Sequence, residues 1–189
     1  MKHIVTYKLF ETETTTMVFW HGGNLENHIQ VRTGKWEYGP GLYLTTNYDT
    51  AKNFAKGSRK LYMITVERGV DIRDVSISTD EIRKFVKSYI IGAKRKEFLI
   101  SVERHNKNGV IKAEIFLNII INNDAVKNTN TEDLKNFFVN NGIDYLIVDN
   151  AYGWGEKMMV LFNMDKIKNK VIIKPSDKIE TYELPTEFS

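Results

Sequence analysis

The sequence has no cysteine, only three prolines and no long apolar run among its 189 residues. The absence of cysteine excludes disulfides, thiolate zinc sites and cysteine nucleophiles, and it fits a reducing cytoplasm. The densest apolar stretch, 115–121, is interrupted by Asn118 and is much shorter than the roughly 20 residues that span a bilayer. The N-terminus has no signal-peptide pattern, so we expect a soluble, cytoplasmic protein with no membrane partner.

Several widespread catalytic motifs are also missing. The sequence has no Walker A motif, no H-E-x-x-H, no G-x-S-x-G and no G-x-G-x-x-G after a strand. Its four histidines lack metal-ligand spacing, so we predict no metal site. The net charge of +3 is only a weak indication of an acidic partner.

The chain does have an ordinary share of hydrophobic residues, 42%, which is enough for one folded domain. No repeat or proline-rich linker divides it, so we predict a single domain over 1–189. Short apolar or alternating runs predict strands near both ends of the chain. Spacing of three and four residues predicts a helical insertion at about 71–130. This order indicates an α+β fold rather than alternating βαβ units.

The boundaries of these elements follow from turn and capping residues. The predicted strands are 5–9, 17–20, 42–44, 61–66, 145–148, 158–162 and 171–173. The predicted helices are 47–56 before Gly57, 82–90 after a cap at Ser78 or Thr79, 111–121, and 131–140 before the turn at Asn141 and Gly142.

Positive charge is concentrated in the predicted helical insertion. We interpret this cluster as a solvated helical face, with a nucleic-acid surface as the alternative. Only Tyr89 interleaves it, whereas single-stranded nucleic acids are usually bound with several stacking aromatics. The cluster consists of Lys84, Lys87, Lys94, Arg95 and Lys96.

His21 is notable because it ends an apolar strand directly before Gly22 and Gly23. At such a position a side chain can face a cleft while bare backbone lets a ligand approach. The alternative is a histidine that caps the strand end through one internal hydrogen bond. Position alone leaves both interpretations open.

Three further residues gain meaning only in combination with His21. Tyr43 begins a short strand after a glycine-rich turn, where a tyrosine usually belongs to the core. Phe54 follows eleven residues later in a predicted helix, and the two rings could hold a flat ring between them. Glu156 precedes an apolar strand with the same parity as Met158, although an acid at a strand mouth is usually solvated.

In this order the segments resemble the ADP-ribosyltransferase superfamily, in its diphtheria-toxin and poly(ADP-ribose)-polymerase-like branch with a His-Tyr-Glu triad. The most specific part is G-P-G-L-Y-L-T-T-N at 39–47 followed by a helix. The segment F-N-M-D-K-I at 162–167 resembles that family's closing F-N-P-D-Q-I. The resemblance covers the first seventy residues and roughly 145–173. It implies split mixed or antiparallel sheets with helices inserted in the middle of the chain.

The resemblance also implies NAD as substrate and assigns roles to matching residues. His21 would hydrogen-bond the adenosine ribose, and the Gly22 backbone would hold the nicotinamide amide. Tyr43 and Phe54 would sandwich the nicotinamide ring, and Thr45 belongs to the same binding set. A carboxylate on the late strand would bind the nicotinamide-ribose 2′-hydroxyl and stabilise developing positive charge.

The identity of that carboxylate is the point where the sequence departs from the family. Alignment on the late strand places Met158 at the family's glutamate position. Glu156 is our catalytic candidate, together with His21 and Tyr43, if a small bulge brings it into register. Asp149 is the reserve. Ala51 stands where the polymerases have a hydroxyl, which favours single transfer over chain elongation.

We therefore expect a mono-ADP-ribosyltransferase that acts on a macromolecular acceptor, a protein rather than a nucleic acid. The alternatives are an NAD glycohydrolase and a non-catalytic NAD- or ADP-ribose-binding module of the same fold. The compact size and the lack of an export signal favour action in the cell that makes the protein or in an infected bacterium. A toxin, a phage or mobile-element effector and a regulator all fit this expectation.

Overall fold

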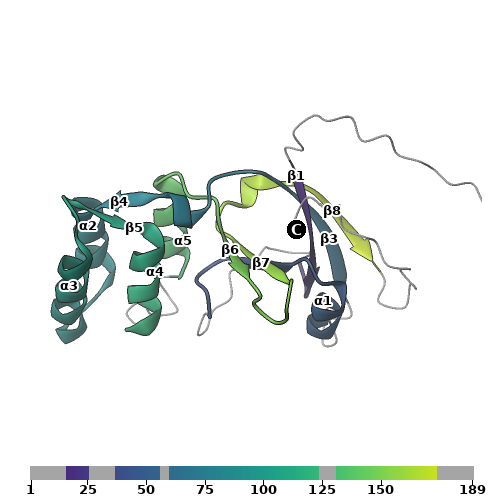
Figure 1. The fold of residues 1–189 in the computed structure, drawn as a ribbon, viewed down its shortest axis with the longest axis horizontal. Helices are drawn as coiled ribbons and strands as arrows, with labels where there is room; N and C mark the ends of the chain where they lie inside the picture. The colour runs from purple at the N-terminus through teal and green to yellow at the C-terminus, as the bar shows by residue number, and fades with distance from the viewer. Residues whose placement is uncertain (1–15, 26–36, 56–59, 124–130, 174–189) are drawn as a thin grey trace, which may run out of the picture.

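The computed structural model describes residues 16–25, 37–55, 60–123 and 131–173, which form an α+β fold. Most strands lie in one half of the molecule, and α2 to α5 lie in the other (Figure 1). The strands are β1 (Thr16–Gly22), β2 (Leu42–Thr45), β3 (Leu61–Glu67), β4 (Ser76–Ser78), β5 (Val110–Lys112), β6 (Tyr145–Asp149), β7 (Lys157–Leu161) and β8 (Ile167–Ile173). The α-helices are α1 (Tyr48–Ala55), α2 (Thr79–Tyr89), α3 (Ala93–His105), α4 (Ala113–Asn122) and α5 (Thr131–Asn140).

The larger sheet has the order β6-β7-β2-β1-β3-β8 and is nearly divided between β2 and β1. Strand β1 pairs with β3 over seven residues and β2 pairs with β7 over four, whereas β1 and β2 pair only at Trp20 and Thr45. The sheet therefore consists of two groups of strands, β6-β7-β2 and β1-β3-β8, which are joined by this one residue pair. Every strand pairing within the sheet is antiparallel, in agreement with the antiparallel variant of the predicted sheet, and one parallel bridge joins Asp71 to Tyr145 of β6.

Strand β7 is buried on both faces from Met158 to Leu161, which accounts for the apolar sequence of these four residues. Met158 and Val160 belong to the core of the helical half, whereas Met159 and Leu161 belong to the core beneath β1 and β3. This alternation follows from the two-residue period of a strand. The segment that leads from Glu156 into the sheet is thus held between two hydrophobic cores.

The helical half is built around phenylalanines. The ring of Phe116 on α4 packs against Phe85, Phe98 and Phe138 from three other helices. Leu134 of α5 joins the same core, so the helical half extends beyond the predicted limit of about residue 130. The predicted helix 111–121 is wrong at its start, because residues 111 and 112 belong to β5.

Helix α3 was not predicted, because only Phe98 and Val102 among its thirteen residues are buried. The other predicted helices agree with α1, α2 and α5 within a few residues, and the Ser78 hydroxyl caps α2 as expected. The predicted strands from residue 17 onward correspond to β1, β2, β3, β6, β7 and the end of β8. The predicted strand 5–9 and Gly57 lie outside the described residues.

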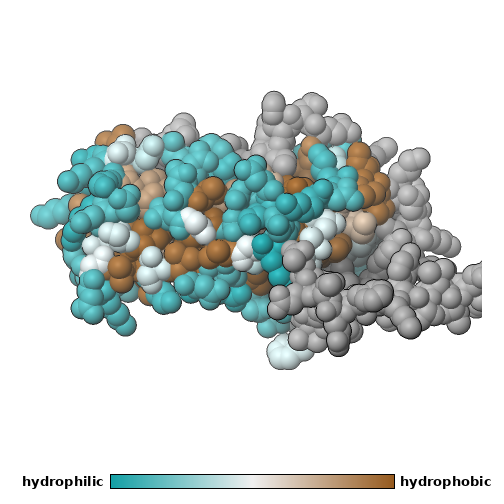
Figure 2. Space-filling model, turned by 90° about the horizontal axis from the view of Figure 1, so that it is seen from above, coloured by the Kyte–Doolittle hydropathy of each residue, from teal (hydrophilic) through white to brown (hydrophobic). Residues whose placement is uncertain are grey.

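The basic cluster lies on α2 and α3, in the half whose surface is mainly hydrophilic with hydrophobic residues between (Figure 2). Lys84 forms an ion pair with Glu81 at 2.8 Å. The Arg95 guanidinium donates to the carbonyl oxygens of Lys87 and Ile90, at the end of α2. These contacts agree with the interpretation as a solvated helical face. No helix in the described ranges is both long and apolar enough to cross a bilayer.

Candidate functional site

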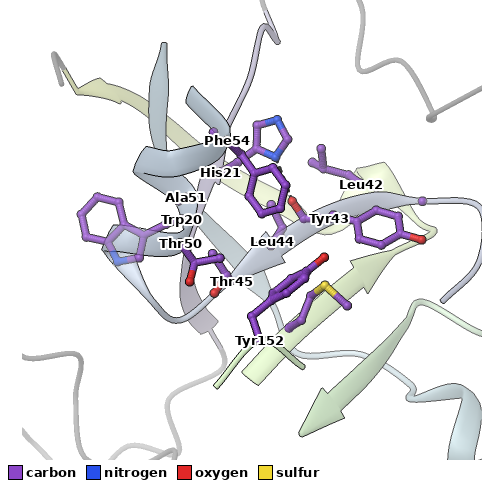
Figure 3. Close-up of a pocket in the computed structure, with 13 residues that line it drawn as sticks. Trp20, His21, Leu42, Tyr43, Leu44, Thr45, Thr50, Ala51, Phe54 and Tyr152 are labelled. Carbon is purple, nitrogen blue, oxygen red and sulfur yellow. Dashed lines mark hydrogen bonds between the residues drawn. The ribbon is translucent and has the colours of Figure 1, made fainter. Parts of the chain in front are cut away.

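A pocket of about 260 Å³ opens where β1 and β2 separate. This volume is near the lower end for small-molecule sites, so it can enclose one ring while the rest of a larger ligand lies outside. Its walls come from β1, β2, α1, β7 and the 150–156 loop, and Figure 3 shows their side chains converging. The lining consists of Trp20, His21, Gly22, Gly41, Leu42, Tyr43, Leu44, Thr45, Thr50, Ala51, Phe54, Tyr152 and Met158.

The His21 imidazole connects the two strands at the point where they separate. Its Nδ1 lies 2.8 Å from the carbonyl oxygen of Tyr43. Burial lowers the pKa of His21, and the hydrogen bond to Tyr43 offsets part of that effect. The ring is therefore neutral near pH 7, with its proton on Nδ1, and Nε2 is left as an acceptor. His21 therefore caps the strand end through one internal hydrogen bond and also lines the pocket, while its role in ligand binding stays a prediction.

Gly22 has a packing reason to be glycine. A Cβ at this position would lie 1.9 Å from the carbonyl oxygen of Ala51 on α1. Only a residue without a side chain lets α1 approach β1 so closely. Gly22 also lines the pocket. The role of its backbone in ligand binding stays a prediction.

Tyr43 forms one wall of the pocket and fixes the preceding turn. Its hydroxyl donates to the carbonyl oxygen of Gly39 at 2.9 Å and accepts from the backbone N–H of Tyr38 at 3.2 Å. The ring is half-buried and packs against the core of the helical half. The expected core role and the pocket position thus coexist.

Phe54 projects from α1 at the pocket, and 57% of it is exposed. Its ring faces that of Tyr152, with the centroids 5.7 Å apart and the planes at 59°. Tyr152 belongs to the loop between β6 and β7 and was not predicted, because its approach to α1 depends on the path of that loop. Tyr43, Phe54 and Tyr152 therefore border the pocket from three different elements.

Glu156 is buried rather than solvated, with only 5% of it exposed. Its Oε1 accepts from the Thr45 hydroxyl at 2.5 Å, and its Oε2 accepts from the Thr50 hydroxyl at 3.0 Å. Both threonines line the pocket, and the carboxylate lies behind them. Thr50 was not predicted, since a threonine in the first turn of a helix carries no signal of its own.

The start of α1 fixes these hydroxyls in place. The Asn47 side chain accepts from the backbone N–H groups of Asp49 and Thr50, as an N-cap residue does. The Thr45 hydroxyl accepts from the N–H of Asn47 while it donates to Glu156. The helix start, strand β2 and the carboxylate therefore form one hydrogen-bonded unit.

The predicted bulge that would bring Glu156 into the family's glutamate position is wrong. Strand β7 pairs with β2 and β6 without a register shift, and Met158 lies opposite Thr45. The pocket is lined by Met158 itself, while Glu156 reaches it only through the two threonines. The reserve candidate Asp149 is exposed, forms an ion pair with Arg73 at 3.4 Å and borders a different hollow.

No family model, no curated protein and no solved structure matches this chain.

Proposed function

We propose that this chain is a mono-ADP-ribosyltransferase that cleaves NAD and transfers ADP-ribose to a macromolecular acceptor, a protein rather than a nucleic acid. One observation carries the proposal. His21, Tyr43 and Phe54, which the family resemblance assigns to NAD, line one pocket, with the Glu156 carboxylate directly behind its threonine wall. His21 and Glu156 are 135 positions apart in the sequence.

The reaction breaks the bond between the nicotinamide nitrogen and C1′ of its ribose. The bonding electrons go to the nitrogen, which neutralises the pyridinium, and the sugar becomes oxocarbenium-like. An acceptor nucleophile then forms a bond to C1′ and releases its proton. Positive charge therefore moves from the ring to the sugar in the transition state, where a fixed carboxylate stabilises it.

Glu156 is suited to this role because it is buried and ordered. A carboxylate accepts about four hydrogen bonds, and the two threonine hydroxyls occupy two of these positions. Because Thr45 and Thr50 stand between the carboxylate and the pocket, its negative charge acts on the sugar across these two hydroxyls, which it also orients. The neutral His21 ring offers Nε2 as an acceptor for a ribose hydroxyl, in agreement with the role expected from the resemblance.

A non-catalytic NAD-binding module is the second candidate. It is favoured by Met158, whose thioether lines the pocket where the family has its glutamate. A thioether stabilises no oxocarbenium charge, so a protein that relies on this residue would bind NAD without cleaving it. An NAD glycohydrolase would use the same pocket with water as the nucleophile.

Incubation of the full chain with NAD tests the proposal. Release of free nicotinamide, followed by mass spectrometry, separates an enzyme from a binding module. Labelled NAD in a cell lysate then separates transfer from hydrolysis, and protease and nuclease digestion of the labelled product identifies the acceptor class. Binding of NAD without release of nicotinamide would overturn the catalytic proposal and support the binding module.

A further inference from the structure

We propose that Tyr152 determines specificity as the third wall of an aromatic cage that prefers the positively charged, oxidised nicotinamide ring to its neutral, reduced form. The inference rests on the proposed function, because it takes NAD as the ligand. Neither the sequence nor the resemblance indicates Tyr152 or a preference for charge.

The geometry places three rings at one opening. Tyr152 comes from the 150–156 loop, Phe54 from α1 and Tyr43 from β2, and all three line the pocket (Figure 3). Phe54 and Tyr152 face each other at 5.7 Å between centroids. Because both are about half exposed, with 57% and 45% accessible, contact with each other leaves much of their surface available to a ligand.

The electrostatics of the pocket favour a cation. The faces of aromatic rings attract positive charge, and several rings around one site bind cations in this way. The carboxylate of Glu156 lies behind Thr45 and Thr50, and no lysine or arginine is among the described residues that line the pocket. The oxidised nicotinamide ring is a planar cation, whereas the reduced ring is neutral. The site should therefore discriminate between them.

The loop that carries Tyr152 has a defined conformation. The backbone N–H of Gly155 donates to the Asn150 side chain at 2.7 Å, and that of Asn150 donates to the carbonyl oxygen of Glu156 at 2.7 Å. Asn150 and Gly155 adopt positive φ angles of 56° and 79°, which bend the chain at both ends of the loop. Tyr152 therefore lies in a loop that is closed by the hydrogen bond between the Asn150 N–H and the Glu156 carbonyl oxygen.

A ring that stacks between Phe54 and Tyr152 must part them and turn their planes from the observed 59° toward parallel. Two stacking contacts of roughly 3.5 Å each require about 7 Å between the flanking rings, which is more than the separation observed. The exposed sides of both rings allow this rotation. Insertion of the ligand ring therefore replaces one ring–ring contact by two.

Calorimetric titration of the full chain with three ligands tests the cage. NAD carries the charged ring, NADH the neutral ring and ADP-ribose no nicotinamide ring, while the adenosine part is common to all three. For Tyr152→Ala we expect the affinity for NAD to fall roughly tenfold and that for ADP-ribose to stay the same. The preference for NAD over NADH should shrink, and Tyr152→Phe should retain it.

Trp154→Ala is the matched control, because Trp154 lies in the same loop, is 98% exposed and does not line the pocket. We expect this variant to bind all three ligands as the unmodified chain does. Equal NAD affinity with and without the Tyr152 ring would overturn the cage and leave the proposed function standing. An equal loss for ADP-ribose would also overturn it, since that ligand has no ring to clamp.

Failure of the proposed function gives a different pattern. If the unmodified chain binds NAD through Tyr152 but releases no nicotinamide, the cage holds and the transferase does not. If the unmodified chain binds neither NAD nor ADP-ribose, both proposals are overturned.

Discussion

The imidazole of His21 donates a hydrogen bond from Nδ1 to the carbonyl oxygen of Tyr43, at 2.8 Å, across the gap between β1 and β2. The backbones of these strands pair only at Trp20 and Thr45, directly beside this contact. A side chain therefore continues the connection where the backbone ladder stops. The same bond holds the strands together and fixes the position of an imidazole that lines the pocket.

The lowered pKa of His21 predicts a loss of stability in mild acid. The folded-state pKa lies below the unfolded value of about 6.5, so the unfolded chain binds the proton more readily. The contribution of His21 is thus fully present above pH 6.5 and is lost as the pH falls through the folded-state pKa. The free energy of unfolding in urea should be lower at pH 5.5 than at pH 7.5. In His21→Gln the difference between the two pH values should be smaller.

His105→Gln provides the control for this titration. His105 is exposed on α3, where its Nδ1 contacts the carbonyl oxygen of Ser101. We expect this variant to keep the pH dependence of the unmodified chain. An unchanged pH dependence in His21→Gln would mean that another group is responsible.

Glu156→Gln should lower NAD turnover by about 10²-fold or more, as the loss of one transition-state stabiliser often does. The amide keeps the shape of the side chain but removes the negative charge. Asp149→Asn is the comparison, since this exposed carboxylate lies outside the pocket. The measurement is the rate of nicotinamide release. A loss of rate in Asp149→Asn alone would mean that Asp149, and not Glu156, is the catalytic carboxylate.

Thr50→Val should reduce kcat by about three- to tenfold with little change in KM, because the hydroxyl positions the carboxylate of Glu156. The valine matches threonine in size, so the packing of α1 changes little. Thr50→Ser keeps the hydroxyl and should retain most of the activity. Steady-state kinetics compare kcat in the two variants. A similar loss of kcat in both would indicate that Thr50 acts through packing and not through its hydroxyl.

Gly22→Ala should destabilise the fold by about 1–3 kcal/mol, which is usual for an overpacked core. The new Cβ would overlap the carbonyl oxygen of Ala51 and push α1 away from β1. Gly153→Ala is the control, since its Cβ would lie 3.8 Å from the Glu156 carboxylate, an ordinary contact. The free energy of unfolding in urea measures both, and equal values would show that α1 adapts easily.

Much of the fold could be predicted from local patterns. The apolar runs around Phe19 and Ile64 are typical of strands. The spacing of apolar residues after the cap at Ser78 is typical of a helix. The resemblance then named five residues that the structure brings to one pocket, although they come from β1, β2 and α1. Short-range sequence signals were sufficient here because each element carries its own pattern.

The remaining features depend on contacts between distant segments. No local pattern reveals that Glu156 is buried, since its burial comes from hydroxyls more than a hundred residues away in the sequence. Tyr152 reaches α1 only through the path of its loop. The start of the helix at 111 was misplaced because β5 forms only by pairing with β4. Each of these features is caused by tertiary contacts, so no local sequence pattern predicts it.

Thr45 combines more connections than any short local pattern implies. Its backbone joins β1 to β2 and pairs with Met158, and its hydroxyl links Asn47, the N-cap residue of α1, to Glu156. A mutational scan should therefore find this position among the least tolerant in the chain. A serine there would preserve the chemistry but lose β-branching, and a valine would preserve the shape but uncouple three parts of the molecule at once.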